Sequence, residues 1–154
     1  MRANDVTTHA EARIVPYSAE LMFQVVADVE KYPVFLPWVV ALRILAREQV
    51  NNREELRAEM VVGFGALREK YISQVILDRE ARTIDVSQAS GPFKQLENHW
   101  RFTPLADGCR VDFSLAYEFR NRMLNAVASA AFGRVYVRMA DAFEARAKAL
   151  SDKT

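Results

Sequence analysis

The chain has 154 residues, 51% of them hydrophobic, and its 21 Lys and Arg nearly balance 20 Asp and Glu, for a net charge of +1. This length predicts one domain with a substantial core, and the balanced charge argues against DNA or a strongly acidic partner. The single cysteine, Cys109, excludes an internal disulfide and a cysteine-rich metal site, which favours a reducing compartment.

The N-terminal residues, MRANDVTTHAEARIV, lack the apolar core of a signal peptide, and their acidic residues argue against a transit peptide. The longest apolar stretch, residues 34–42, contains Pro37 and is far shorter than the roughly 20 residues needed to span a bilayer. We therefore expect a cytoplasmic protein.

Residues 6–15 alternate with the period of a half-buried strand. The face that we expect to be buried carries Ala10, Ala12 and Ile14. The face that we expect to meet solvent carries His9, Glu11 and Arg13. This strand begins the predicted fold.

A short amphipathic helix is predicted next, with Ser18 as its N-cap and apolar residues at helical spacing behind it. We expect Pro33 to end it, because a residue that precedes proline avoids the helical region. The two prolines of YPVFLPWVVALRIL, residues 32–45, disfavour both a helix interior and a central strand. Residues 32–38 are therefore interpreted as a stiff loop that either caps the core or forms one wall of an apolar cavity.

From Val39 to Phe119, strand-like runs are separated by turn signals near residues 51–54, 63–65, 78–82, 90–92 and 107–108. The last two runs alternate most clearly, and their apolar faces carry Leu96, Asn98, Trp100 and Phe102, then Val111, Phe113, Leu115, Tyr117 and Phe119. Apolar residues from Leu124 to Leu150 recur at helical steps and predict one long helix. This order predicts an α+β domain whose curved antiparallel sheet wraps around the C-terminal helix.

Small side chains dominate residues 125–133, NAVASAAFG, of the predicted long helix. They can leave volume for a ligand between helix and sheet, or they can allow close packing. Gly133 suggests that something approaches the helix closely there. Gln88 and Asn98 are uncharged hydrogen-bonding residues on apolar strand faces, so either can meet a polar group of a ligand or be satisfied by backbone.

No catalytic or metal-binding residues are predicted. His9 and His99 are expected on solvent-facing strand surfaces without metal-ligand spacing, and Cys109 is interpreted as a structural cysteine. The segment Gly63-Phe64-Gly65 lacks the pattern of a phosphate-binding loop and predicts a hairpin with an apolar tip, either exposed or folded back on the domain.

Three segments resemble the ubiquinone-binding (coenzyme Q-binding) proteins of the START, or polyketide cyclase/dehydrase-like, superfamily: YSAELMFQVVADVEKYPVFLPWV, GPFKQLENHWRF and AFGRVYVRMADAFEARAK. The resemblance implies a single helix-grip, START-like lipid-binding domain over residues 1–154. It further implies a non-enzymatic carrier or chaperone that holds ubiquinone or a similar isoprenoid lipid and supports respiratory electron transport. No catalytic cofactor is implied, and the protein is expected in the cytoplasm or peripherally at the inner face of the respiratory membrane.

The ligand is expected between the sheet, the aromatic loop and the long helix. The expected ligand-binding residues are Tyr32, Phe35, Leu36, Trp38, Phe64, Phe93, Leu96, Asn98, Trp100, Ala128, Ala131 and Val135. Phe64, Phe93 and the loop around Phe35 are also expected to form an apolar rim that contacts a membrane surface.

Two alternatives stand beside this reading. The same family includes bacterial ribosome-association toxins, and in that case Arg120, Arg122, Arg134 and Arg138 are expected to face RNA of the large ribosomal subunit. An enzyme of the cyclase or hydrolase type is the other alternative. The balanced charge weakens the first alternative, and the missing catalytic pattern weakens the second.

Overall fold

The computed structural model describes residues 6–64 and 67–152, with only the backbone described for Phe64 and Leu67. The elements follow in this order: β1 (Thr7–Val15), α1 (Ala19–Ala27), a 3-10 turn (Val29–Lys31), α2 (Tyr32–Phe35), β2 (Val39–Val50), β3 (Arg53–Phe64), β4 (Leu67–Asp78), β5 (Thr83–Ser90), β6 (Phe93–Leu105), β7 (Gly108–Phe119) and α3 (Arg122–Ser151).

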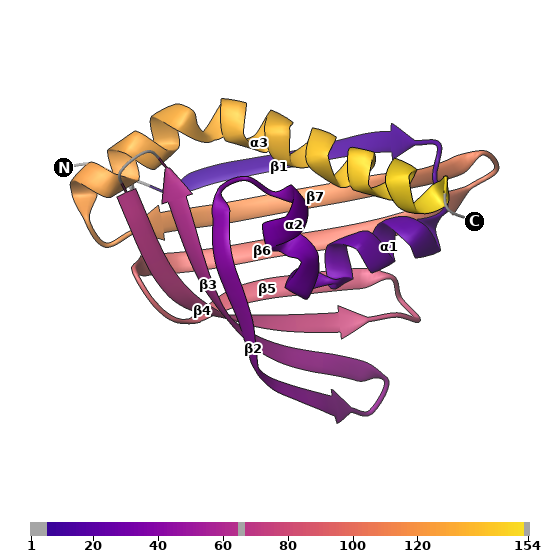
Figure 1. The fold of residues 1–154 in the computed structure, drawn as a ribbon, viewed down its shortest axis with the longest axis horizontal. Helices are drawn as coiled ribbons and strands as arrows, with labels where there is room; N and C mark the ends of the chain where they lie inside the picture. Colours follow the sequence, from indigo (N-terminus) through magenta and orange to yellow (C-terminus); the bar gives the residue numbers. More distant parts are fainter. Residues whose placement is uncertain (1–5, 65–66, 153–154) are drawn as a thin grey trace.

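The strands form one antiparallel sheet in the order β1-β7-β6-β5-β4-β3-β2. The helices α1, α2 and α3 lie on one side of this sheet, and α3 runs along β1 and β7 (Figure 1). Register shifts leave an extra residue in β2, β5 and β6, and such bulges bend strands and increase their twist. The predicted α+β architecture, a curved sheet against a long C-terminal helix, is confirmed.

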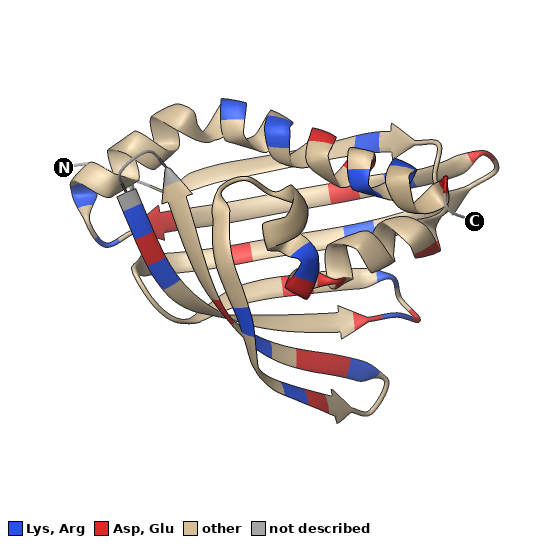
Figure 2. Ribbon diagram, in the orientation of Figure 1, with Lys and Arg blue, Asp and Glu red and all other residues tan. Residues whose placement is uncertain are grey.

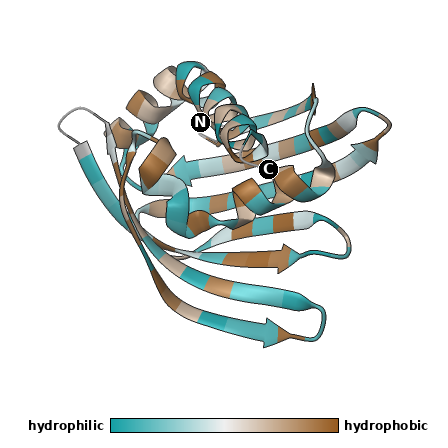
Figure 3. Cartoon of the chain, turned by 45° about the vertical axis from the view of Figure 1, so that its right-hand side comes forward, coloured by the Kyte–Doolittle hydropathy of each residue, from teal (hydrophilic) through white to brown (hydrophobic). Residues whose placement is uncertain are grey.

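Side chains on successive residues of a strand point to opposite faces, so one-sided burial requires alternating polarity. Hydrophobic and hydrophilic residues alternate along the strands in this way (Figure 3). Trp100 and Phe113, which are register partners on β6 and β7, both lie on the buried inner face. The assignment of the inner face of β6 and β7 from the sequence is therefore correct.

The strand β1 has the opposite orientation to the one predicted. Ile14, expected in the core, is 72% exposed, while Arg13 faces α3 and pairs with Glu144 and Asp141. Thr7 likewise bonds to Ser129 of α3, with 3.1 Å between the hydroxyl oxygens. The polar residues of β1 turn inward because α3 supplies charged and hydroxyl partners for them.

The helix α1 begins as predicted, since the Ser18 hydroxyl accepts a 3.0 Å hydrogen bond from the Leu21 amide. The expected effect of Pro33 is wrong. Tyr32 is helical, with φ −52° and ψ −43°, and Pro33 lies in the first turn of the separate short helix α2. Proline is tolerated there because the first turn leaves its amides without intrahelical partners.

The long helix α3 spans 30 residues, as predicted, and Asn121 caps it by accepting a 2.9 Å hydrogen bond from the Leu124 amide. The close approach expected at Gly133 is absent, because a Cβ built there meets no described atom within 4 Å. Gly108 has a much tighter neighbour than Gly133. A Cβ on it would lie 2.0 Å from the Val15 carbonyl oxygen of β1.

Candidate functional site

The inner face of the sheet is sealed at one end, where α1 packs on β6 and β7. The side chains there are almost completely buried: Leu56, Leu77, Ile84, Phe102 and Cys109. Burial also raises the pKa of the Cys109 thiol, so it stays protonated and unreactive. Cys109 is thus a structural core residue, as the sequence indicated.

Further along the same strands, the inner face is incompletely covered. Its apolar side chains are only partly buried there, although they point to the helical side of the sheet: Val62, Tyr71, Val86, Leu96 and Leu115. On α3, Ala128, Ala131 and Val135 are also partly buried. We call these eight residues, 62, 71, 86, 96, 115, 128, 131 and 135, the open inner strip. Four of the predicted ligand residues belong to this set of partly buried positions: Leu96, Ala128, Ala131 and Val135.

Residues 32–38 are not the loop that the sequence predicted, because residues 32–35 form the helix α2. This aromatic segment packs mainly on the C-terminal half of α3. The ring centroids of Tyr32 and Phe35 each lie 5.5 Å from that of Phe143. The guanidinium carbon of Arg146 lies over the Phe35 ring, 5.6 Å from its centroid. The indole of Trp100 also contacts Phe143, at 5.5 Å. Leu36 is buried and Trp38 is partly buried against the core. The segment therefore caps the core, as one of the two interpretations of residues 32–38 from the sequence expected.

Phe93 does not form an exposed rim. It is 8% exposed and stacks on Phe119 with 4.4 Å between ring centroids, with Tyr71 and Tyr117 against its edges. Phe35 is covered by the contacts just described, and the side chain of Phe64 lies outside the described residues. Phe93 packs inward because its strand begins at the inner face, where three aromatic neighbours bury more of its surface than an exposed turn would.

The two amides predicted to meet a ligand are already engaged. Asn98 donates a 2.9 Å hydrogen bond to the Ser114 carbonyl and accepts one of 2.9 Å from the Trp100 indole. Gln88 donates to the Phe93 carbonyl at 3.0 Å and accepts from the Phe93 amide at 2.9 Å. Both side chains therefore fix the local structure of the sheet.

Tyr71 is the polar residue of the strip that the sequence analysis missed. Among the described residues, its hydroxyl donates only to the Met60 sulfur, at 3.4 Å, and a thioether is a weak acceptor. Burial raises the pKa of Tyr71 to about 12, so the phenol remains a hydrogen-bond donor at neutral pH. The signal available in the sequence was the two-residue spacing of Tyr71 from Ser73, Val75 and Leu77, which places it on the same strand face as two apolar residues.

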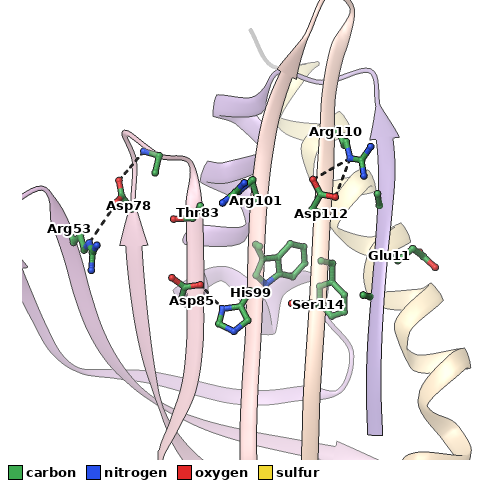
Figure 4. A pocket seen from close by; sticks show the side chains of 15 residues that line it. Glu11, Arg53, Asp78, Thr83, Asp85, His99, Arg101, Arg110, Asp112 and Ser114 are labelled. Atoms are coloured by element: carbon green, nitrogen blue, oxygen red, sulfur yellow. Dashed lines mark hydrogen bonds and ion pairs between the residues drawn. The ribbon is translucent and has the colours of Figure 1, made fainter.

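The outer face of the sheet carries a hollow of about 800 Å³, and many of the residues that line it are charged (Figure 4). His99 lies 2.6 Å from an Asp85 oxygen through one ring nitrogen and 3.8 Å from Glu97 through the other. Arg110 contacts Asp112 at 3.1 Å. Both ring nitrogens of His99 face carboxylates, so this arrangement is a surface charge network. It offers no lining suited to a lipid tail.

His9 is not on the solvent-facing surface where it was predicted. Its ring lies 4.6 Å from Tyr136 and 5.3 Å from Phe132 of α3, and its Nε2 atom is buried without a hydrogen-bond partner among the described residues. Residues 6–64 and 67–152 contain no group of three or more candidate metal ligands. Within the same residues, no helix is long and apolar enough to cross a membrane.

A family model described as polyketide cyclase/dehydrase and lipid transport matches residues 15–144. The chain belongs to this family. That match covers α1, α2, all strands from β2 to β7 and most of α3, so it includes both sides of the open inner strip. The START-like, helix-grip architecture inferred from the sequence is confirmed.

Relatives within the family carry two kinds of name. The ribosome association toxin RatA of Escherichia coli is 36% identical over 88% of this chain and 83% of its own. The mitochondrial coenzyme Q-binding protein COQ10 homolog B of Xenopus laevis is 32% identical over 90% of this chain. The matched region is 57% of that longer protein.

Solved structures of other proteins have the same fold. An 18 kDa protein of Caulobacter crescentus is 38% identical, superimposes with a TM-score of 0.80, and is matched over 95% of this chain and 99% of its own. The ZhuI aromatase/cyclase of Streptomyces, at 19% identity and a TM-score of 0.77, shares the fold over 93% of this chain and 94% of its own.

Proposed function

We propose that this chain binds ubiquinone or a similar isoprenoid lipid along the open inner strip and acts as a non-enzymatic carrier or chaperone in support of respiratory electron transport. The observation that carries this proposal is the change in burial along the strands. Side chains of the same inner face go from fully buried, as at Leu77, to partly buried, as at Tyr71. An apolar surface left partly exposed inside a fold is the kind of surface that small-molecule sites use.

The helix side of the strip suits an elongated ligand. Ala128, Ala131 and Val135 are spaced by three and four residues, so they share one flank of α3. Their small side chains leave room beside the helix where leucine or phenylalanine would fill it. An isoprenoid tail is long, flexible and apolar, and it can follow this flank opposite Leu96 and Leu115.

Tyr71 supplies the polar contact in this proposal. A quinone carbonyl oxygen is a better hydrogen-bond acceptor than the Met60 sulfur. The Tyr71 hydroxyl would therefore form a stronger hydrogen bond by donating to the quinone instead of to Met60. Trp38 and the Tyr32–Phe35 segment are proposed to border the site through their partly buried faces. Asn98 and Trp100 support the site from within the sheet rather than by direct contact.

The relatives are consistent with this proposal, because the coenzyme Q-binding proteins of Xenopus laevis and Drosophila melanogaster are 32% and 31% identical to this chain. The test is mass spectrometry of lipid extracted from protein purified without detergent, followed by titration with ubiquinone. We expect about one quinone or isoprenoid lipid per chain. Protein that carries no such lipid and takes none up in the titration would contradict the proposal.

Ribosome association is the second candidate function. It rests on the toxin relatives, which match this chain over most of both lengths, and on exposed arginines of α3. All four arginines named for it are exposed, and the Arg120 guanidinium also donates a hydrogen bond to the Gly91 carbonyl. Sedimentation with large ribosomal subunits at two salt concentrations tests this candidate, because phosphate contacts weaken as salt rises. Saturable co-sedimentation, together with no quinone uptake, would favour it over the carrier.

A further inference from the structure

The outward side of α3 carries a row of exposed apolar residues, and no described element covers it. Met123 is 77% exposed, Val127 48% and Val137 52%. Together with Ala130 and Arg134, they are spaced by four, three, four and three residues, which places them on one side of a helix with 3.6 residues per turn. We call residues 123, 127, 130, 134 and 137 the outward row.

Contacts elsewhere on α3 fix the direction of this row. Phe132 and Tyr136 pack on His9 of β1, and Arg13 of β1 reaches Glu144. Ala131 and Val135 occupy the flank beside the open inner strip. The outward row is therefore turned away from the sheet and lies next to that flank.

Arginines are the only charged residues in the first two-thirds of α3. Residues 122–140 contain Arg122, Arg134 and Arg138 and no aspartate or glutamate. All three arginines are exposed, and within residues 6–64 and 67–152 their guanidinium groups have no ion-pair or hydrogen-bond partner. Acidic residues return at Asp141, so the unbalanced positive charge ends where the row ends (Figure 2).

We propose that the outward row docks on the surface of an anionic phospholipid bilayer. Aliphatic side chains flanked by arginines on one helix side fit the boundary between lipid headgroups and acyl chains. Three aliphatic side chains supply little apolar area, so docking depends on the arginines and on anionic lipid. RNA fits this surface less well, because single-stranded RNA is bound by aromatic stacking and the row has no aromatic residue. Docking goes beyond quinone binding and places the open inner strip beside the membrane.

The experiment is co-sedimentation of the full chain with quinone-free vesicles, either of phosphatidylcholine alone or with phosphatidylserine added. Wild type is expected to bind the anionic vesicles, and more weakly as salt rises. Each arginine near such a surface contributes about fivefold in affinity, so Arg138→Gln should weaken binding about fivefold and Arg134→Gln/Arg138→Gln about 25-fold. Met123→Ser should also weaken it several-fold.

Two matched controls make the result specific. Arg101→Gln removes one exposed positive charge from the outer face of the sheet, and Ile14→Ser removes an equally exposed aliphatic side chain from β1. Neither should change vesicle binding. The proposal is overturned if wild type does not bind anionic vesicles, or if the controls weaken binding as much as the α3 variants. It is also overturned if the α3 variants lose binding to ribosomes or to a protein partner while their vesicle binding is intact. Because the vesicles contain no quinone, these outcomes are independent of whether the strip binds quinone.

Discussion

The Trp100 indole donates a 2.9 Å hydrogen bond to the Asn98 side-chain oxygen, two residues away on the inner face of β6. The same amide donates to the Ser114 carbonyl of β7. Asn98 therefore joins two strands and fixes the large indole that packs on Phe143. A residue that reads as a ligand contact in the sequence is a structural link in the fold.

Replacing this link should lower stability and leave ligand binding largely intact. In Asn98→Leu, the Trp100 indole N–H and the Ser114 carbonyl lose the Asn98 side chain as a hydrogen-bond partner. The unfolding free energy should therefore fall by about 1–3 kcal/mol. Urea unfolding followed by tryptophan fluorescence measures the loss. Unchanged stability combined with loss of quinone binding would instead assign Asn98 to the ligand.

Filling the open inner strip should separate binding from stability. In Ala131→Leu, the larger side chain enters partly open space, so we expect nearly unchanged unfolding free energy and weaker quinone binding. Ala147→Leu is the matched control on the same helix. Ala147 is 0% exposed, and overpacking there should cost about 1–3 kcal/mol. If Ala131→Leu destabilises the protein as much as Ala147→Leu does and the quinone titration is unaffected, Ala131 is tightly packed and the strip leaves no room for a ligand.

The buried phenols predict how stability responds to alkaline pH. Burial raises the pKa of Tyr71 to about 12, and burial together with the Glu11 carboxylate raises that of Tyr136 to about 12, from 10.0. A group whose pKa is higher in the folded state contributes stability that is complete below its unfolded pKa and is lost as pH rises. The unfolding free energy should therefore fall between about pH 10 and 12. Urea unfolding across this range should show a smaller fall in Tyr71→Phe/Tyr136→Phe. An equal fall in that variant would contradict the assignment.

Two glycines should respond in opposite ways to alanine. Gly133→Ala meets no described atom within 4 Å and replaces glycine inside a helix, so it should raise the unfolding free energy by about 1 kcal/mol. Gly108→Ala forces a Cβ to within 2.0 Å of the Val15 carbonyl oxygen and should destabilise the pairing of β1 with β7. Thermal unfolding of the two variants checks both directions, and a destabilised Gly133→Ala would reveal a contact on that side of α3.

The sequence predicted the parts of the fold that depend on local patterns. The alternation around Trp100 and Phe113, the Ser18 cap and the long helix from Leu124 to Leu150 all appear as expected. The face of β1 could not be predicted, because the partners that draw Arg13 inward are Asp141 and Glu144, more than 120 residues away. Local alternation says which residues share a face, but the opposing element decides which face is buried.

The candidate site was predictable only in part. Ala128, Ala131 and Val135 could be assigned to one flank of α3 because helical spacing is a local pattern, and their contact with a ligand stays a prediction. Phe93 was placed on a rim because an aromatic after a Gly-Pro turn looks exposed, and its burial depends on Tyr71, Tyr117 and Phe119. Tyr71 was missed because its weak bond to a sulfur atom becomes visible only when β3 and β4 are paired.

Methyl NMR during a ubiquinone titration tests the central claim most directly. The account predicts saturable shift changes, at one quinone per chain, for the methyl groups of Leu96, Leu115, Ala131 and Val135 in the open inner strip. The methyl groups of Leu56, Leu77 and Ile84 at the sealed end should stay unchanged, because they are almost completely buried. Shift changes centred on the outer face of the sheet, or no saturable change at any methyl group, would contradict the claim that this strip is a quinone site.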